Sequence, residues 1–155
     1  MNKNKIKILI VEDSLEWIKF HINLLNQFFE TDLIEIDFEM SARAGFNKVI
    51  KKSETRYDLI ISDLEMETIL EEDYAGSWFV RNILKREECK NSKILIISGS
   101  HDIKEVANGF NVDFIPKYAL SNNPEIMSYK LEEILPICHS EEQSDVRIYP
   151  ENNIE

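Results

Sequence analysis

Four short apolar segments of this chain each lead into polar side chains that could handle a phosphoryl group. Residues 6–11, 58–62, 93–97 and 112–116 lead into Glu12 with Asp13, Asp63, Ser98 and Lys117, respectively. In a doubly wound parallel sheet, the carboxyl ends of the strands lie along one edge, which is where ligands bind. If these segments are strands of such a sheet, their polar side chains meet at a single site.

Three of these side chains are carboxylates, and together they predict a metal site. Two like charges about 4 Å apart repel by about 4 kcal/mol at an effective dielectric constant of about 20. Glu12, Asp13 and Asp63 therefore need a proton or a cation between them. Mg²⁺ is the expected ion, because it accepts a few carboxylate oxygens and completes its shell with water and phosphate oxygens.

The same residues predict phosphoryl transfer to a carboxylate. Asp63 can act as the nucleophile and form an acyl phosphate. Ser98 offers a hydroxyl group, and Lys117 a mobile positive charge, to the added phosphoryl oxygens. Mg²⁺ and Lys117 together offset the charge that develops during transfer. Each residue alone has an ordinary explanation, such as a solvated acidic pair or a surface lysine, but their common placement after buried segments favours a shared function.

The elements that must position these residues follow a strand–helix alternation. The pattern predicts strands near residues 6–11, 33–39, 58–62, 93–97 and 112–116, and helices near 14–30, 41–52, 76–88, 102–109 and 124–135. Asn123 and Pro124 supply a capping side chain and a preset backbone angle for the start of the last helix. The predicted fold class is α/β, with a three-layer, doubly wound sheet of five parallel strands covered by helices on both faces.

Length and composition limit the remaining possibilities. A chain of 155 residues, 43% hydrophobic and 30% charged, fits one domain, predicted at residues 1–136, followed by a mobile acidic tail at 137–155. Its 29 acidic and 18 basic residues give a net charge of −11, which disfavours nucleic-acid and membrane partners. Two cysteines without metal-ligand spacing, and no apolar segment of membrane-spanning length, predict a reduced, cytoplasmic protein.

The polar motifs resemble those of the receiver domain of two-component response regulators, and of single-domain, chemotaxis-type regulators in particular. VED with Glu12 and Asp13 resembles the metal-binding acidic pair of the family, and DLIISDLEM with Asp63 resembles its phosphorylation motif. Ser98 and Lys117 match its switch hydroxyl and its lysine. The resemblance covers about residues 5–136 and implies a flavodoxin-like sheet with the strand order 2-1-3-4-5.

This resemblance implies a role in a phosphorelay. Asp63 would receive a phosphoryl group from the phosphohistidine of a histidine kinase or a histidine phosphotransfer protein. The main-chain carbonyl of Glu65 would join the three carboxylates at the Mg²⁺ ion, and Phe114 would be the switch aromatic residue that reports phosphorylation to the surface. A protein of this family catalyses its own phosphorylation and dephosphorylation without turnover of an external substrate, and it signals through a downstream protein partner.

Two departures from the family pattern lie beside the expected site. The acidic stretch at residues 67–73 makes its loop about five residues longer than usual. As a surface insertion it costs little, whereas as a functional element it would change metal affinity or access of the phosphoryl donor. Tyr118 follows Lys117 where most relatives have proline, so the usual kinked peptide after the lysine is in question.

The first predicted helix has more apolar surface than one sheet face requires. Leu15, Ile18 and Ile22 belong to one apolar stripe, and a second stripe beside it widens the apolar arc to about 220°, against about 100° for a helix that covers one face. One interpretation is a docking surface for the kinase or phosphotransfer protein, and the other is deeper burial by neighbouring elements. His21 is interpreted as a satisfied histidine at the core edge, and Trp17 is expected near the site.

Two other functions remain as alternatives. An interaction module could keep the fold and work without phosphorylation. A flavin or nucleotide enzyme of similar winding is disfavoured, because its phosphate-binding loop after the first strand is rich in Gly, Ser and Thr, whereas this chain has Glu12 and Asp13 there.

Overall fold

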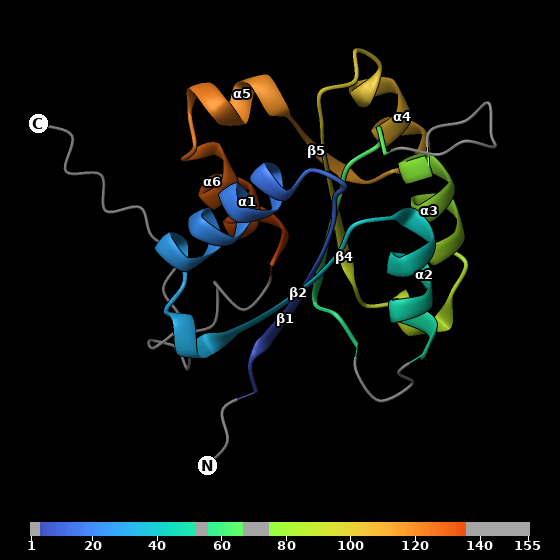
Figure 1. The fold of residues 1–155 in the computed structure, drawn as a ribbon, viewed down its shortest axis with the longest axis horizontal. Coiled ribbons are helices and arrows are strands. Elements are labelled where there is room, and N and C mark those ends of the chain that lie inside the picture. Colours follow the sequence, from blue (N-terminus) through green and yellow to red (C-terminus); the bar gives the residue numbers. More distant parts are fainter. Residues whose placement is uncertain (1–3, 52–55, 67–74, 136–155) are drawn as a thin grey trace, which may run out of the picture.

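The protein folds around a parallel sheet. The structure is a computed structural model that describes residues 4–51, 56–66 and 75–135. Figure 1 shows its five parallel strands, which lie in the order β2-β1-β3-β4-β5. Their bounds are β1 (Ile6–Val11), β2 (Ile34–Glu39), β3 (Leu59–Ser62), β4 (Lys93–Ser98) and β5 (Asp113–Pro116). The predicted fold class and strand order are confirmed, and each strand lies within one residue of its predicted range.

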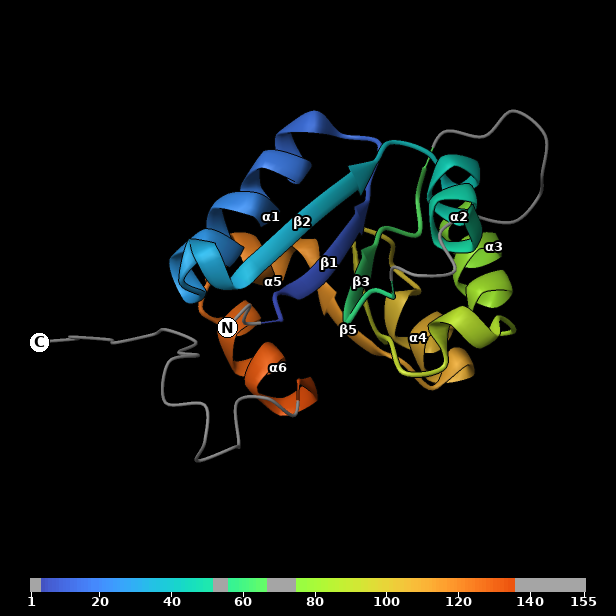
Figure 2. The same cartoon turned by 90° about the horizontal axis from the view of Figure 1, so that it is seen from below.

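Helices cover both faces of this sheet. Their bounds are α1 (Leu15–Phe28), α2 (Ala42–Lys51), α3 (Ala75–Ile83), α4 (Ile103–Phe110), α5 (Lys117–Asn122) and α6 (Ile126–Ile134), with short 3-10 turns η1 (Thr31–Leu33) and η2 (Glu87–Cys89). Helices α1, α5 and α6 lie on one face and α2, α3 and α4 on the other (Figure 1), and the perpendicular view shows the sheet between the two groups (Figure 2).

Alternate residues of the strands face two separate cores. In β1, Ile8 and Ile10 are buried with residues of α1, α5 and α6, whereas Leu9 and Val11 are buried with residues of α2, α3 and α4. Full burial of such a side chain contributes about 1.5–3 kcal/mol. Because both faces are covered, the central strands are mostly apolar, and the polar side chains of the site lie at the strand ends or just beyond them.

The register of the central strands sets the height at which these polar residues leave the sheet. Val11 of β1 lies opposite Ser62 of β3. The next residues, Glu12 and Asp63, therefore leave the sheet at the same level. The backbone N–H of Asp63 donates to the carbonyl of Val11 at 3.1 Å, which continues the pairing of the two strands up to the site.

The segment after β5 differs from the prediction. It forms helix α5, which begins at Lys117. The sequence pattern predicts no helix between the end of the last strand and residue 124. Asn123 closes α5, and α6 follows Glu125 without a side-chain cap. The predicted Asn123 cap is therefore wrong, because Asn123 belongs to the end of a helix that is too short to be recognised by apolar periodicity. The peptide bonds of the described residues are all trans, including the one that joins Lys117 to Tyr118.

Other differences concern the length of one helix and the range that is described. The helix predicted at residues 76–88 ends at Ile83 and is followed by η2. The acidic stretch at 67–73 and the tail at 137–155 lie outside the described residues. Within the described part of the chain, no helix has the length and apolar character needed to cross a membrane.

Candidate functional site

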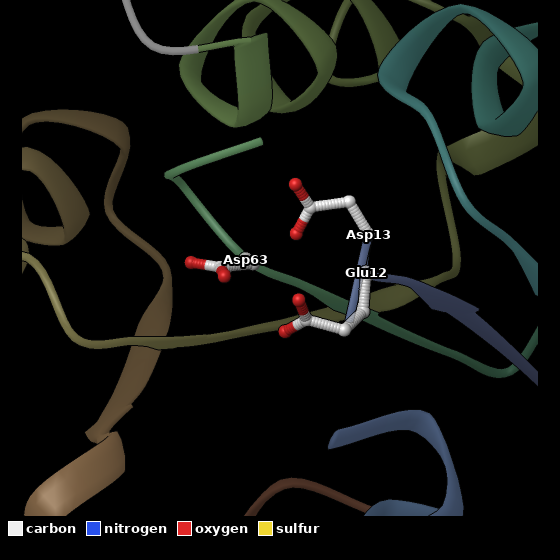
Figure 3. A group of neighbouring side chains, drawn as sticks. All are labelled: Glu12, Asp13 and Asp63. Carbon is white, nitrogen blue, oxygen red and sulfur yellow. The ribbon is translucent and has the colours of Figure 1, made fainter. Parts of the chain in front are cut away.

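Three carboxylate groups gather at the carboxyl edge of the central strands. Glu12 and Asp13 follow β1 and Asp63 follows β3, and Figure 3 shows their side chains around one shared space. One oxygen atom from each residue lies within 4.8 Å of the others. Only 2% of Glu12 and 3% of Asp63 is exposed. The structure thus brings together the three carboxylates that the sequence predicts as a cluster.

Backbone groups fix the orientation of two of these side chains. The N–H of Glu65 donates to Asp63 Oδ1 at 3.1 Å, and the N–H of Ser14 donates to Glu12 Oε1 at 3.1 Å. The backbone N–H of Glu12 itself donates to the carbonyl of Glu39 at the end of β2. Each carboxylate therefore has one oxygen held by the backbone, and its second oxygen remains for another partner.

Gly76 at the start of α3 lets the chain around Asp63 pack closely. A Cβ atom at this position would lie 1.8 Å from the carbonyl oxygen of Asp63 and 2.5 Å from the Cα atom of Leu64. The N–H of Gly76 also donates to the carbonyl of Leu64 at 3.1 Å. Only glycine fits such a backbone approach. The sequence pattern shows a glycine here, but the close approach becomes visible only in the structure.

Lys117 provides the positive charge at the site. Its Nζ donates to Asp63 Oδ2 at 2.7 Å and lies 2.9 Å from Glu12 Oε2. Burial alone would lower the pKa of Lys117, but hydrogen bonds to Asp63 and Glu12, and then their charges, raise it above its usual value. The ammonium group thus remains charged and bridges residues from β1 and β3, as the sequence predicts for a lysine at this edge.

The negative charge still exceeds what one lysine neutralises. The pKa of Glu12 is raised from 4.5 to about 7, first by burial and then by the charge of Asp63, although Lys117 and the Ser14 N–H act in the opposite direction. Glu12 Oε2 is buried and lacks an aligned hydrogen bond, even though the Lys117 ammonium forms an ion pair with it. A site with these properties favours a further cation.

The donor set fits a hard divalent cation. Glu12, Asp13 and Asp63 offer carboxylate oxygens within 4.8 Å of one another, and Mg²⁺ binds oxygen ligands of this kind while it keeps several waters. Such an ion would supply the positive charge that the raised pKa of Glu12 indicates is needed. The residues present are therefore suited to the Mg²⁺ ion predicted from the sequence.

Ser98 lies at the same edge, on the side of Lys117. It is the last residue of β4 and pairs in register with Pro116, which directly precedes Lys117. Its side chain is buried, and its hydroxyl oxygen accepts the N–H of Ser100 at 3.2 Å. The next residue, Gly99, would place a Cβ atom 4.0 Å from Lys117 Cδ. Ser98 therefore lies at the strand end next to the one that leads into Lys117, and its role as a switch hydroxyl remains a prediction.

Two further predicted residues have defined positions but untested roles. Phe114 is half-buried in β5 and packs against the core shared with α2, α3 and α4. Glu65 is exposed, and its N–H contacts Asp63. The metal contact predicted for the Glu65 carbonyl and the switch role predicted for Phe114 remain predictions.

The structure corrects one residue of the docking surface predicted on the first helix. Ile18 has an exposed fraction of 1% and lies in the core, so it cannot contact a partner. Leu15 is 48% exposed and Ile22 is partly buried. Residues of α5 and α6, such as Leu120 and Met127, share the core with α1. The wide apolar arc of this helix is thus explained mainly by deeper burial.

His21 is more deeply buried than a residue at the core edge. Its Nδ1 atom has no hydrogen-bond partner, so the predicted satisfied histidine is wrong. Burial first, and then the charge of Lys117, lower its pKa from 6.5 to about 4. Its ring lies 5.7 Å from that of Trp17. Trp17 itself lies beside the site, as expected, with Lys117 Nζ 4.8 Å from its ring centroid.

Comparisons with known proteins concern the fold. No family model and no curated protein sequence matches the chain. Among solved structures it is similar to the chemotaxis protein CheY4 of Vibrio cholerae, with 23% identity and a TM-score of 0.66 over 84% of this chain and 99% of that one. It is also similar to the phosphorylated cyanobacterial phytochrome response regulator RcpA, with 23% identity and a TM-score of 0.70 over 86% and 95%.

A third similar structure is a CheY-like response regulator receiver domain protein from Methanospirillum hungatei. It shares 20% identity, with a TM-score of 0.61 over 86% of this chain and 94% of that one. The chain spans nearly the whole length of all three. It therefore has the fold of CheY-like response regulator receiver domains.

Proposed function

We propose that this protein is a phosphorylatable receiver that accepts a phosphoryl group on Asp63 from a phosphohistidine. The observation that carries the proposal is the contact of Lys117 Nζ with Asp63 Oδ2 at 2.7 Å, beside the carboxylates of Glu12 and Asp13. A nucleophilic carboxylate, a cation-binding acidic pair and an ammonium group beside them are the parts that phosphoryl transfer to an aspartate requires. The receiver fold supports this assignment.

In the proposed reaction, an oxygen atom of Asp63 attacks the phosphorus atom of the donor. The new oxygen–phosphorus bond forms as the phosphorus–nitrogen bond of phosphohistidine breaks, and the imidazole nitrogen keeps the electron pair and later takes a proton. The Glu65 N–H holds Asp63 Oδ1 in place, so Oδ2, which contacts Lys117, is the atom placed to react. Lys117 then pairs with the phosphoryl oxygens.

Glu12, Asp13 and Asp63 are the residues that would hold Mg²⁺, together with the main-chain carbonyl of Glu65 that the family resemblance adds. When bound, the ion offsets negative charge on the transferring group. The Ser14 N–H keeps Glu12 Oε1 oriented toward the edge of the site. Neutralising this cluster is needed for a dianionic phosphoryl group to approach it.

The proposed output passes through protein contacts. Ser98 would bond the added phosphoryl group, and Phe114 would change position in response. The donor would be a histidine kinase or a histidine phosphotransfer protein in the cytoplasm, and a downstream protein would read the result. The receiver is proposed to span residues 1–136, with residues 137–155 as a tail.

The test is covalent modification by a small phosphodonor. With acetyl phosphate and Mg²⁺, intact-mass spectrometry should show one phosphoryl adduct on the full chain, and Asp63→Asn should abolish it. Asp32→Asn, which changes an exposed aspartate in η1, is the matched control and should keep the adduct. If neither acetyl phosphate nor phosphoramidate modifies the wild-type protein, the proposal fails and an interaction module that works without phosphorylation becomes the better explanation.

A further inference from the structure

Trp17 makes a contact at the site that the proposed chemistry does not use. The Lys117 ammonium lies over its indole ring, with Nζ 4.8 Å from the ring centroid. This distance is within the range of about 6 Å for a cation–π interaction. Trp17 is partly buried and lies in the first turn of α1. The same ammonium thus contacts two carboxylates and one aromatic face.

The neighbours of Trp17 hold its ring in place. The backbone N–H of Trp17 donates to the capping Ser14 side chain at 3.4 Å. The ring packs edge to face against Phe20, with centroids 5.3 Å apart, and lies 5.7 Å from His21. A shallow depression of about 280 Å³ is lined by Glu16, Trp17, Phe20 and Ser121, so one side of the indole faces solvent. These contacts therefore hold the Trp17 side chain in a defined position.

We propose that Trp17 is a positioning residue that holds the Lys117 ammonium at the phosphoryl-acceptor site. The inference rests on the proposed function, because it assigns a role in the same reaction. The inference adds a residue to the proposed site, since Trp17 is neither a metal ligand nor the nucleophile.

The properties of the lysine side chain explain why a positioning residue is needed. Lysine is a flexible chain that ends in a strongly hydrated charge, and it loses much rotamer freedom when it is held in one place. During transfer the ammonium must leave its contact with Asp63 Oδ2 and follow the incoming oxygens. The indole face gives it a partner that is not an anion, so the charge shifts between partners without moving out into water.

Tryptophan has the aromatic face that binds cations best. Trp17→Phe should therefore retain part of the effect, and Trp17→Leu should remove it. Trp78→Leu is the matched control, because Arg43 lies over that indole at 4.4 Å from its centroid, while Trp78 belongs to α3 on the opposite face of the sheet. Thermal unfolding of each variant establishes that the full chain is folded before the comparison.

The first measurement is the NMR chemical shift of the Lys117 Hε protons in the unphosphorylated protein. Protons held over an indole face are shifted upfield by the ring current. We expect this shift in the wild type and in Trp78→Leu, and its loss in Trp17→Leu. The shift shows that the end of the lysine side chain lies over the indole in solution, and unshifted Lys117 Hε protons in the wild type would overturn the proposal.

The second measurement is the rate of phosphorylation by acetyl phosphate at saturating Mg²⁺. We expect a decrease of about tenfold in Trp17→Leu and a smaller one in Trp17→Phe, because only a contact that is used in the transition state changes this rate. Equal rates in Trp17→Leu and Trp78→Leu would refute the role in transfer. If the wild type accepts no phosphoryl group, the proposed function fails, and the chemical shift alone then decides whether Trp17 holds Lys117.

Discussion

Replacing Glu12 by glutamine should remove one contribution to stability, the one that weakens the fold as pH rises from 4.5 to about 7. Glu12 is buried beside Asp63 and Lys117, and its pKa is raised from 4.5 to about 7. Burial is the largest cause and the charge of Asp63 the second. Glutamine keeps the shape of the side chain and an oxygen for the Ser14 N–H, but it carries no charge.

The sign follows from comparing the folded and unfolded chains. Between pH 4.5 and about 7 the folded protein keeps a proton on Glu12 that the unfolded chain has released, so stability falls as pH rises through this interval. Each pH unit corresponds to about 1.4 kcal/mol, so the loss is about 3 kcal/mol by pH 8. In Glu12→Gln this loss is absent, and the free energy of unfolding relative to wild type should rise by about 3 kcal/mol between pH 4.5 and 8.

The assay is urea unfolding of both proteins at several pH values in the presence of a chelator. The comparison with wild type cancels the titrating groups that do not interact with Glu12. Glu105→Gln, which changes an exposed residue of α4, is the control. Mg²⁺ at pH 8 should stabilise the wild type more than Glu12→Gln, because an ion that binds the folded state raises its stability. An equal pH dependence of Glu12→Gln and wild type would refute the electrostatic reasoning.

Four further substitutions test the surroundings of the site and a control position. Gly76→Ala should destabilise the protein by about 2 kcal/mol or more in chemical unfolding, because the added methyl group would strike the Asp63 carbonyl. Gly109→Ala in α4 has open space around it and should raise stability by about 0.5–1 kcal/mol. His21→Leu should remove a loss of stability of about 3 kcal/mol as pH falls from 6.5 to 4, because the lowered pKa makes the unfolded chain the better proton acceptor in that interval. Ser98→Ala should cost about 1 kcal/mol in thermal unfolding, since it leaves a buried backbone N–H without its acceptor.

The pKa of Glu12 is raised and that of His21 is lowered, and together these shifts determine how the stability of the wild type depends on pH. Protonation of Glu12 favours the folded state as pH falls below about 7, whereas protonation of His21 favours the unfolded chain below about 6.5. Both intervals overlap, so the two contributions largely cancel. The wild-type protein should therefore show a flat stability profile there, and each single variant should show a slope.

Much of the architecture was predictable from local patterns. The central strands β1, β3 and β4 are short segments with apolar residues on both faces, and such segments are found where both sheet faces are covered. Glu12, Asp63 and Lys117 were placed together because parallel strands share one carboxyl edge, and the register of Val11 with Ser62 brings this about.

The remaining features depend on contacts between distant segments. Ile18 became core because α5 and α6 cover α1, and the sequence of α1 alone does not reveal that cover. The fit of Gly76 against Asp63 is a tertiary approach that no periodicity reports. The unpartnered Nδ1 atom of His21 was not predicted for the same reason, since the burial of this residue is set by neighbouring elements. Helix α5 has too few residues for a recognisable apolar repeat.

Helix α5 begins at Lys117 itself, so no loop residues separate the lysine of the acidic site from this helix. Pro116 ends β5, and the next residue already belongs to the helix. A displacement of the Lys117 amine therefore either changes the torsions of its own side chain or moves the short helix α5. Tyr118 follows at once and is 72% exposed, so a spectroscopic label at that position would detect rotation of the helix and stay silent when only the lysine torsions change.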